Sequence, residues 1–476
     1  MELNDFPNEV LSTIFSHLST KRDKHCLDSR YFPRVWPIRL VCRRWNDIAT
    51  AQLFHTLTLH HTLRAKEEDF SSWHSLLETD AIRAAVRRVA IESSPWSPWR
   101  QPGDKYDDYL TDKRPEFASA INRICDLPHL DVLEVRFSRF CAGRHTVRHK
   151  GNIEPSTTRA RTLKTVLKAM RRRAARPDTT VIRELVLDHL QNMPLPKDLT
   201  DGLLENIERL HLQIADELTM TPEDRAHLCE WHEYHPYLQN TLLPPVAEQL
   251  VELTISGNQT WGAIPGQFNG KGLHFPRLKT LTLAQYVIAR QDQFEWVLSL
   301  ESLTSLRLHS CSIATHILVL QPDFARWKID MRDWKRVTDR PMVQTYDEPR
   351  SRYKKNPDEH YLTPGYYLHP LRWDVMFESI RERLPHLQEF RFTKEDWDLF
   401  FRHASTSLGL VSDRYIGFGK YWCPLRDYNV AASHYIEENR WGEPKKLLEI
   451  TEEADRRALE RLLETTRERR MTARPV

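Results

Sequence analysis

The chain has 476 residues, which is long enough for two or three domains with at least one sizeable hydrophobic core. Its 69 Lys and Arg residues against 66 Asp and Glu residues give a formal net charge of +3, so the overall charge favours neither a nucleic-acid nor a membrane partner. With 40% hydrophobic and 28% charged residues, the composition excludes wholesale disorder. No run of 18 apolar residues occurs, which argues against a membrane-spanning helix.

The seven cysteines are scattered along the chain, and the N-terminus lacks the basic-then-apolar pattern of a secretion signal. An odd, unclustered set of cysteines predicts free thiols in a reducing compartment. We therefore expect the protein to reside in the cytoplasm, the nucleus or both.

Two amphipathic helices are predicted within the first fifty residues. The first stripe of apolar side chains at helical spacing comprises Val10, Leu11, Ile14, Phe15 and Leu18, after Pro7 at the first helical position. The second stripe comprises Leu40, Val41, Trp45, Ile48 and Ala49. Two helices this short bury too little apolar surface to close a core alone, so a partner surface is expected to complete them.

This segment resembles the F-box. The residues that carry the resemblance are Leu3, Phe6, Pro7, Glu9, Val10, Leu11, Ile14, Phe15 and Leu18, then Leu40-Val41-Cys42-Arg43-Arg44-Trp45 with Ile48 and Ala49. The family implies a three-helix module that docks on the Skp adaptor of cullin–RING ubiquitin ligases. The resemblance assigns adaptor binding to Pro7, Val10, Leu11, Ile14, Leu18, Leu40, Val41, Cys42 and Trp45. The connection between Leu18 and Leu40 is longer than is usual in the family, so the middle of the motif is poorly matched. The alternative is that these helices only cap the following domain.

An apolar-x-x-apolar-x-apolar pattern recurs downstream. Its copies begin at residues 54, 86, 130, 182, 207, 250, 278, 303 and 387. Three of the intervals are 25, 28 and 25 residues, which lie within the range of leucine-rich repeats, and the longer intervals indicate insertions or missed copies. The last two apolar positions of each copy alternate with polar residues, so they are predicted to point inward from a short strand.

The predicted fold class is α/β: N-terminal all-α F-box helices followed by an irregular leucine-rich-repeat solenoid of strand–helix repeats around a curved parallel sheet. An ordinary α/β domain with buried strands is the alternative. The chain resembles the F-box proteins of filamentous fungi that carry degenerate leucine-rich repeats. In that family architecture the solenoid binds the protein to be ubiquitylated.

Five domains are predicted. They are the F-box over residues 1–52, the solenoid over 53–313, an irregular aromatic-rich insertion or degenerate repeat over 314–383, the last repeat and cap over 384–443, and a charged C-terminal helix or tail over 444–476. The insertion contains Trp327, Trp334, Tyr346, Tyr353, Tyr361, Tyr366, Tyr367 and Trp373. It is either a binding loop or a repeat whose aromatic side chains pack inside. The C-terminal helix is expected from Thr451 to about Arg470.

No catalytic constellation or cofactor-binding motif is found, so the protein is predicted not to be an enzyme and to need no cofactor. Two groups of potential zinc ligands lack a completing partner or a common helix face. They are Cys125, Cys141, His145 and His149, and His227, Cys229, His232 and His235. We therefore predict no metal site.

One region is strongly basic. Between Arg139 and Arg176 there are twelve Lys and Arg residues and a single acidic residue, Glu154. The solvated outer face of a repeat helix is one explanation. The other is capture of an acidic or phosphorylated segment by Arg171, Arg172 and Arg173, because arginine forks pair well with phosphate.

The leading hypothesis is a substrate-receptor subunit of an SCF-type cullin–RING ubiquitin ligase. It would bind the Skp adaptor through the F-box and an unknown protein substrate through the solenoid, with the cullin scaffold as a further partner in the complex, and would act by proximity. The alternatives are an F-box interaction scaffold without ligase activity and a nucleic-acid-associated factor that uses residues 139–176.

Overall fold

The computed structural model describes residues 3–18, 37–60, 70–93, 115–139, 141–142, 153–217, 229–262, 267–319, 330–336, 365–393, 414–418, 424–425 and 438–473. These residues form two compact units. Unit 1 comprises the described residues up to 191 together with 195–217. Unit 2 comprises residues 192–194 and the described residues from 229 onward.

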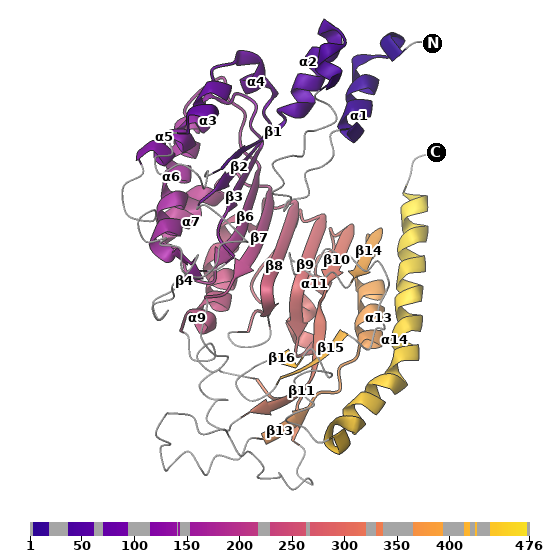
Figure 1. Ribbon diagram of the computed structural model, residues 1–476. Helices are drawn as coiled ribbons and strands as arrows, with labels where there is room; N and C mark the ends of the chain where they lie inside the picture. The colour runs from indigo at the N-terminus through magenta and orange to yellow at the C-terminus, as the bar shows by residue number, and fades with distance from the viewer. Residues whose placement is uncertain are drawn as a thin grey trace. The chain divides into compact units, whose positions relative to one another are not determined.

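Helices and strands alternate along unit 1 (Figure 1). Its helices are η1 (Leu3–Asp5), α1 (Asn8–Leu18), η2 (Pro37–Leu40), α2 (Arg43–Leu53), α3 (Ser71–Leu76), α4 (Asp80–Ala85), α5 (Pro115–Asn122), η3 (Arg123–Asp126), α6 (Ser156–Ala174) and α7 (Lys197–Leu204). Its strands are β1 (Thr56–Leu59), β2 (Arg88–Glu92), β3 (Val132–Arg136), β4 (Cys141–Ala142), β5 (Glu154–Pro155), β6 (Glu184–Gln191) and β7 (Arg209–Ala215).

The main sheet of unit 1 joins β1, β2, β3, β6 and β7 in this order, and each pairing is parallel. The repeat positions lie in register across it. One row comprises Leu57, Val89, Leu133, Leu185 and Leu210, and the next comprises Leu59, Ile91, Val135, Leu187 and Leu212. All ten side chains are buried. Because parallel neighbours need crossover connections, helices occupy the intervals, and α5, α6 and α7 lie along one side of the strands (Figure 1).

The opposite face of this sheet carries charged side chains. Glu134 is 1% exposed and lies between Arg88 and Arg136, whose nitrogens approach its carboxylate oxygens to 2.5 and 2.7 Å. Burial alone would raise the pKa of Glu134, but the two guanidinium groups outweigh it and hold this pKa below its ordinary value. The apolar row positions therefore lie on the covered face, whereas the residues between them place charged side chains such as Arg88, Glu134 and Arg136 on the other face.

Unit 2 continues the alternation of helices and strands. Its helices are α9 (Cys229–Tyr237), the π-helix η4 (Leu238–Leu242), α10 (Pro244–Ala247), η5 (Gln291–Phe294), α11 (Glu295–Leu298), α13 (Trp373–Arg383) and α14 (Glu438–Thr472). Its strands are β8 (Glu252–Trp261), β9 (Thr280–Ile288), β10 (Ser305–His309), β11 (Ser312–Val319), β12 (Lys335–Arg336), β13 (Gly365–Leu368), β14 (Glu389–Thr393), β15 (Tyr415–Phe418) and β16 (Pro424–Leu425).

Within unit 2, β8, β9, β10 and β14 are parallel neighbours, and the repeat positions are again in register. One row comprises Leu253, Leu281, Leu306 and Phe390, and the next comprises Ile255, Leu283, Leu308 and Phe392. Every copy of the pattern found in the sequence therefore coincides with a strand. The prediction of short strands with inward-facing apolar residues is confirmed, as is the mixed α/β class with a large parallel sheet.

The described aromatic side chains of the interval 314–383 point into unit 2. Trp373 is fully buried and stacks on Phe377, with ring centroids 5.3 Å apart. Trp334 is buried, with its ring centroid 5.0 Å from that of His369. Tyr367 packs against the core cluster that contains Trp334. The side chains of Trp327, Tyr346, Tyr353, Tyr361 and Tyr366 lie outside the described part of the chain. This packing favours a repeat with internal aromatic residues, and the boundary expected between residues 313 and 314 falls inside β11.

The C-terminal helix begins earlier than the predicted Thr451, because α14 starts at Glu438, and it packs along α13 (Figure 1). The fully buried Asp455 accepts the backbone N–H of Asp374, at the start of α13, at 2.8 Å. At the other end, Arg469 donates to the carbonyls of Leu384 and Arg381 at 2.9 and 3.0 Å. Asp455 lies at the N-terminus of α13 and Arg469 at its C-terminus, so both charges complement the dipole of α13. Helix α14 therefore holds α13 at both ends.

Candidate functional site

The N-terminal module (residues 3–18 and 37–54) is built around a small core. Leu11, Phe15 and Ala49 are buried where α1 meets α2. Five partly buried side chains pack against them, namely Phe6, Ile14, Ile38, Trp45 and Ile48. The ring of Trp45 meets Phe15 edge-on, with centroids 5.3 Å apart. The two predicted apolar stripes therefore face each other only in part, through Leu11, Ile14 and Phe15 on α1 and Trp45, Ile48 and Ala49 on α2.

Polar contacts tie α1 to α2 at two places. Arg44 donates through Nε to Asn8 Oδ1 at 2.7 Å and through Nη2 to the carbonyl of Phe6 at 2.5 Å. Further along, Gln52 Nε2 donates to Ser12 Oγ at 2.7 Å. These bonds fix the relative position of the two helices without using any of the module's exposed apolar side chains.

Apolar side chains remain exposed on the module. Leu40 is 84% exposed, Val41 57%, Leu3 53% and Val10 39%. These four, called here the exposed apolar set, are most of the seven large hydrophobic residues that are exposed in the described part of the chain. Scattered single exposures are ordinary on a protein surface, but a concentration of them marks an interaction surface. The module is therefore the strongest candidate for docking.

The predicted adaptor-binding residues divide into two groups. Pro7, Val10, Leu40, Val41 and Cys42 are exposed and available to a partner. The others with a described side chain support this surface from within: Leu11 is fully buried, and Ile14 and Trp45 are half-buried. Leu18 is the last residue of α1, but its side chain, like the connection over residues 19–36, lies outside the described part of the chain.

The module is also attached to the rest of unit 1, because α2 packs against α4. This contact is the one expected if the helices cap the following domain. It leaves the exposed apolar set uncovered within unit 1, so capping does not account for those side chains.

A family model described as F-box-like matches residues 3–60, which include the module and β1. The match supports an F-box protein and, in general terms, an adaptor role in ubiquitin ligation, because domains of this kind typically bind the Skp adaptor. No curated protein matches the chain. Within the described ranges, no helix combines the length and the apolar character needed to cross a lipid bilayer.

The basic segment requires one correction. Arg171 and Arg172 are exposed on α6, but Arg173 is 1% exposed. Its guanidinium donates to the carbonyls of Leu127, Pro128, Leu130 and Thr180. Burial lowers the pKa of Arg173 to about 10. Arg173 is therefore a structural residue that satisfies buried carbonyl groups, and the prediction that it contacts a partner is wrong.

A second arginine of α6, Arg159, also points inward. It is 3% exposed, forms an ion pair with the buried Glu154 at 3.1 Å and donates to the carbonyl of His189 at 2.6 Å. Arg159 belongs to the basic segment 139–176, yet it does not lie on a solvated outer face. Its burial could have been predicted from the sequence, because Arg159 precedes the buried Leu163 and Val166 by four and seven residues and so shares their face of the helix.

The potential zinc ligands are not brought together in the described residues. Cys141 is buried, and burial raises the pKa of its thiol to about 12, while His145 and His149 lie outside the described residues. His235 is buried beside Trp261, with ring centroids 6.1 Å apart. No group of three metal-ligating side chains forms among the residues that the structure describes.

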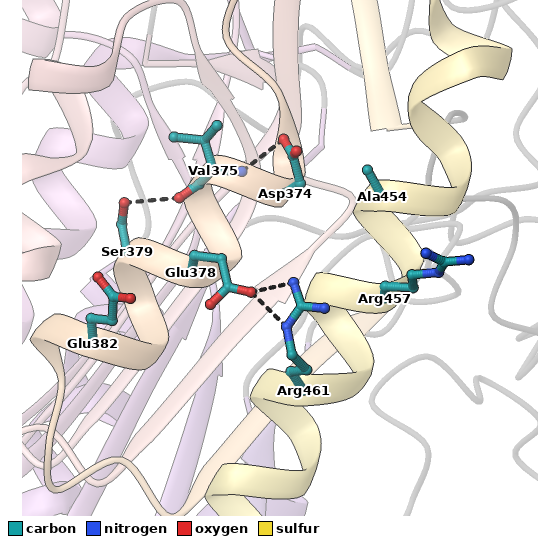
Figure 2. A pocket seen from close by; sticks show the side chains of 8 residues that line it. All are labelled: Asp374, Val375, Glu378, Ser379, Glu382, Ala454, Arg457 and Arg461. Atoms are coloured by element: carbon teal, nitrogen blue, oxygen red, sulfur yellow. Dashed lines mark hydrogen bonds and ion pairs between the residues drawn. The ribbon is translucent and has the colours of Figure 1, made fainter.

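An open cavity of about 530 Å³ lies between α13 and α14 (Figure 2). Figure 2 shows Asp374, Glu378 and Glu382 along α13, opposite Arg457 and Arg461 on α14. Glu378, in the middle, pairs with Arg461 at 2.8 Å and with Arg381 at 2.7 Å. Because these arginines neutralise the charge of Glu378, we interpret the cavity as a junction between two helices and not as a ligand site.

Proposed function

We propose that the protein is a substrate-receptor subunit of an SCF-type cullin–RING ubiquitin ligase, with the N-terminal module as its Skp-binding element. The observation that carries the proposal is the exposed apolar set, which lies on a module whose core of Leu11, Phe15 and Ala49 is already buried. The F-box-like match over residues 3–60 gives this surface its class of partner.

The exposure of Leu40 and Val41 sets the scale of the interaction. Full burial of a Leu or Val side chain contributes about 1.5–3 kcal/mol. With Leu40 84% and Val41 57% exposed, covering both would contribute roughly 3 kcal/mol, or about 150-fold in affinity. These two residues alone should therefore account for a large part of the affinity for the adaptor.

For the remainder of the chain we propose a leucine-rich-repeat solenoid that binds the target protein, as in the F-box proteins of filamentous fungi that the sequence resembles. The support is the parallel order of consecutive strands and the register of their apolar rows in both units. The receptor contributes no catalytic group in this proposal. It accelerates ubiquitin transfer by raising the effective concentration of the target, in the cytoplasm, the nucleus or both.

The test is the substitution of two members of the exposed apolar set, Leu40→Asp together with Val41→Asp, in the full chain. The matched control is Val181→Asp, because Val181 is 50% exposed in unit 1 but lies outside the module. Isothermal titration against purified Skp adaptor should show at least about a hundredfold loss for the double variant and no loss for the control. Equal binding by all three proteins would refute the assignment.

Co-purification with the cullin scaffold separates the receptor from a scaffold without ligase activity. A receptor is expected to retain cullin through the adaptor, and to lose both partners together in the double variant. Retention of the adaptor without cullin would favour the scaffold instead.

A further inference from the structure

Helix α6 exposes a row of cations. Lys164, Lys168, Arg171 and Arg172, called here the basic stripe, are exposed at positions i, i+4, i+7 and i+8 of this 19-residue helix. The row extends over about 12 Å at 1.5 Å per residue. The exposed Arg161 continues it by one turn, and the helix contains no acidic residue.

The stripe is not explained by the stability of the helix. Arg171 and Arg172 lie in the last turn, where a cation complements the helix dipole. Lys164 and Lys168 lie in the middle of the helix, where the dipole gives them no such advantage. Like charges four residues apart destabilise a helix by about 0.2–0.5 kcal/mol.

Another exposed helix of the same protein shows the contrast. On α14, Arg456 pairs with Glu453 and Glu460, and Arg457 pairs with Glu453, each within 3.0 Å. On α6, Lys164, Lys168 and Arg171 form no ion pair with any described residue. The charges of these three cations are therefore available for an anionic partner.

The surroundings of the stripe limit what that partner is. Helices α5 and α7 both pack against α6, and they expose the carboxylates of Glu116 and Asp198. A nucleic-acid duplex is wider than one helix and would bring its phosphates toward these acids. The stripe also offers no aromatic side chain on which the bases of a single strand would stack. A single narrow anionic chain fits better.

We propose that the basic stripe binds a short anionic peptide segment, with its negative charge supplied by Asp and Glu carboxylates or by phosphoserine. That this segment belongs to the protein delivered for ubiquitylation rests on the proposed function. The binding itself rests only on the charge and exposure of α6.

The experiment uses the full chain and fluorescent peptides of about twelve residues, which are long enough to span the stripe either extended or helical. One peptide alternates Glu and Ser, a second carries phosphoserine in place of Ser, and a third replaces Glu by Gln. A single-stranded RNA and a DNA duplex of similar total charge complete the set. Binding is measured by fluorescence anisotropy over a range of salt concentrations.

The test variant combines Lys164→Glu, Lys168→Glu and Arg171→Glu. The matched control combines Lys164→Arg, Lys168→Arg and Arg171→Lys, which keeps every charge. We expect the charge reversal to weaken binding of an anionic peptide at least about tenfold and the control to change it less than about twofold. Thermal unfolding verifies that both fold, and the triple substitution to Gln replaces the Glu variant if the latter does not.

Binding of the Glu peptide identifies carboxylates as sufficient, and binding of the phosphoserine peptide alone identifies phosphate; both outcomes support the proposal. It is overturned if neither peptide binds, if charge reversal leaves binding unchanged, or if RNA or DNA binds more tightly than the peptides. Adaptor binding, measured on the same variants, is independent of these outcomes. Intact adaptor binding with no peptide binding refutes this inference only. Unchanged adaptor binding by the Leu40→Asp, Val41→Asp variant refutes only the proposed function.

Discussion

The buried carboxyl group of Asp455 should make the docking of α14 depend on pH. Asp455 Oδ1 accepts the N–H of Asp374 at 2.8 Å, and Oδ2 accepts the hydroxyl of Tyr415 at 2.7 Å. The Tyr415 oxygen also accepts the N–H of Trp373 at 2.8 Å. Burial raises the pKa of Asp455 to about 6, although these two hydrogen bonds favour the ionised form, and the carboxylates of Asp374 and Glu452 add to the rise.

The sign of the effect follows from the difference between the folded and unfolded pKa values. The folded protein holds this proton more tightly than the unfolded chain, whose ordinary value is 3.8, so protonation stabilises the fold. This contribution is fully present below about pH 4 and is lost as the pH rises through about 6. At 1.36 kcal/mol per pKa unit the loss is at most about 3 kcal/mol, and roughly 2 kcal/mol of it falls between about pH 4 and about pH 8, because the unfolded carboxyl group is already largely ionised at pH 4.

The substitution Asp455→Asn isolates this contribution because an amide stays neutral at every pH. The Asn oxygen can still accept the Asp374 N–H. Any rearrangement around Tyr415 would change the free energy of unfolding of the variant by the same amount at every pH. Urea unfolding, followed by the fluorescence of the buried Trp373, gives the free energy of unfolding of both proteins. Between about pH 4 and about pH 8, the difference between them should change by roughly 2 kcal/mol in favour of the variant. A difference that stays constant over this range would refute the reasoning.

Two further substitutions test the module and α6. Trp45→Ala removes the edge-on contact with Phe15 and should destabilise the module by about 3 kcal/mol, with faster proteolysis of the N-terminus and loss of adaptor binding, whereas Trp45→Phe should retain both. Full adaptor binding by the Ala variant would contradict the role given to Trp45. Arg173→Met should lower the free energy of unfolding by about 3–5 kcal/mol, because it leaves several buried carbonyl groups unpaired, while the neighbouring exposed Arg172→Met should change it by less than about 0.5 kcal/mol. Equal effects in thermal denaturation would show that Arg173 is not the structural residue described here.

The strands were predictable because their signal is local. In each copy of the pattern the last two apolar residues are separated by one polar residue, and this alternation alone decides which side chains enter the core. Leu133 and Val135 of β3 illustrate it, since both are fully buried while Glu134 between them faces the other side. The register of neighbouring strands needed no separate signal, because parallel repeats of the same pattern align their apolar positions to bury them together.

Buried polar side chains were not predicted, because their burial depends on partners distant in the sequence. Arg173 is buried to serve carbonyls of residues 127–130, and Asp455 is buried by Tyr415, forty residues away. Each nevertheless lies within an apolar stripe: Arg173 follows Val166 and Met170, and Asp455 precedes Leu459 and Leu462. A charged residue at an apolar position of a helix is therefore a usable sign of a buried network.

The module shows where the sequence-based argument for a partner needs revision. The two helices were expected to require a partner to complete their core, yet Leu11, Phe15 and Ala49 are buried without one, and α2 gains further support from α4. What remains for a partner is the covering of the exposed apolar set, Leu40 and Val41 above all. Because a surface held in place before binding loses less conformational freedom on association, the closed core favours affinity instead of replacing the partner. It follows that Trp45 and Leu40 affect adaptor binding by separable routes, the first through the stability of the module and the second through contact alone.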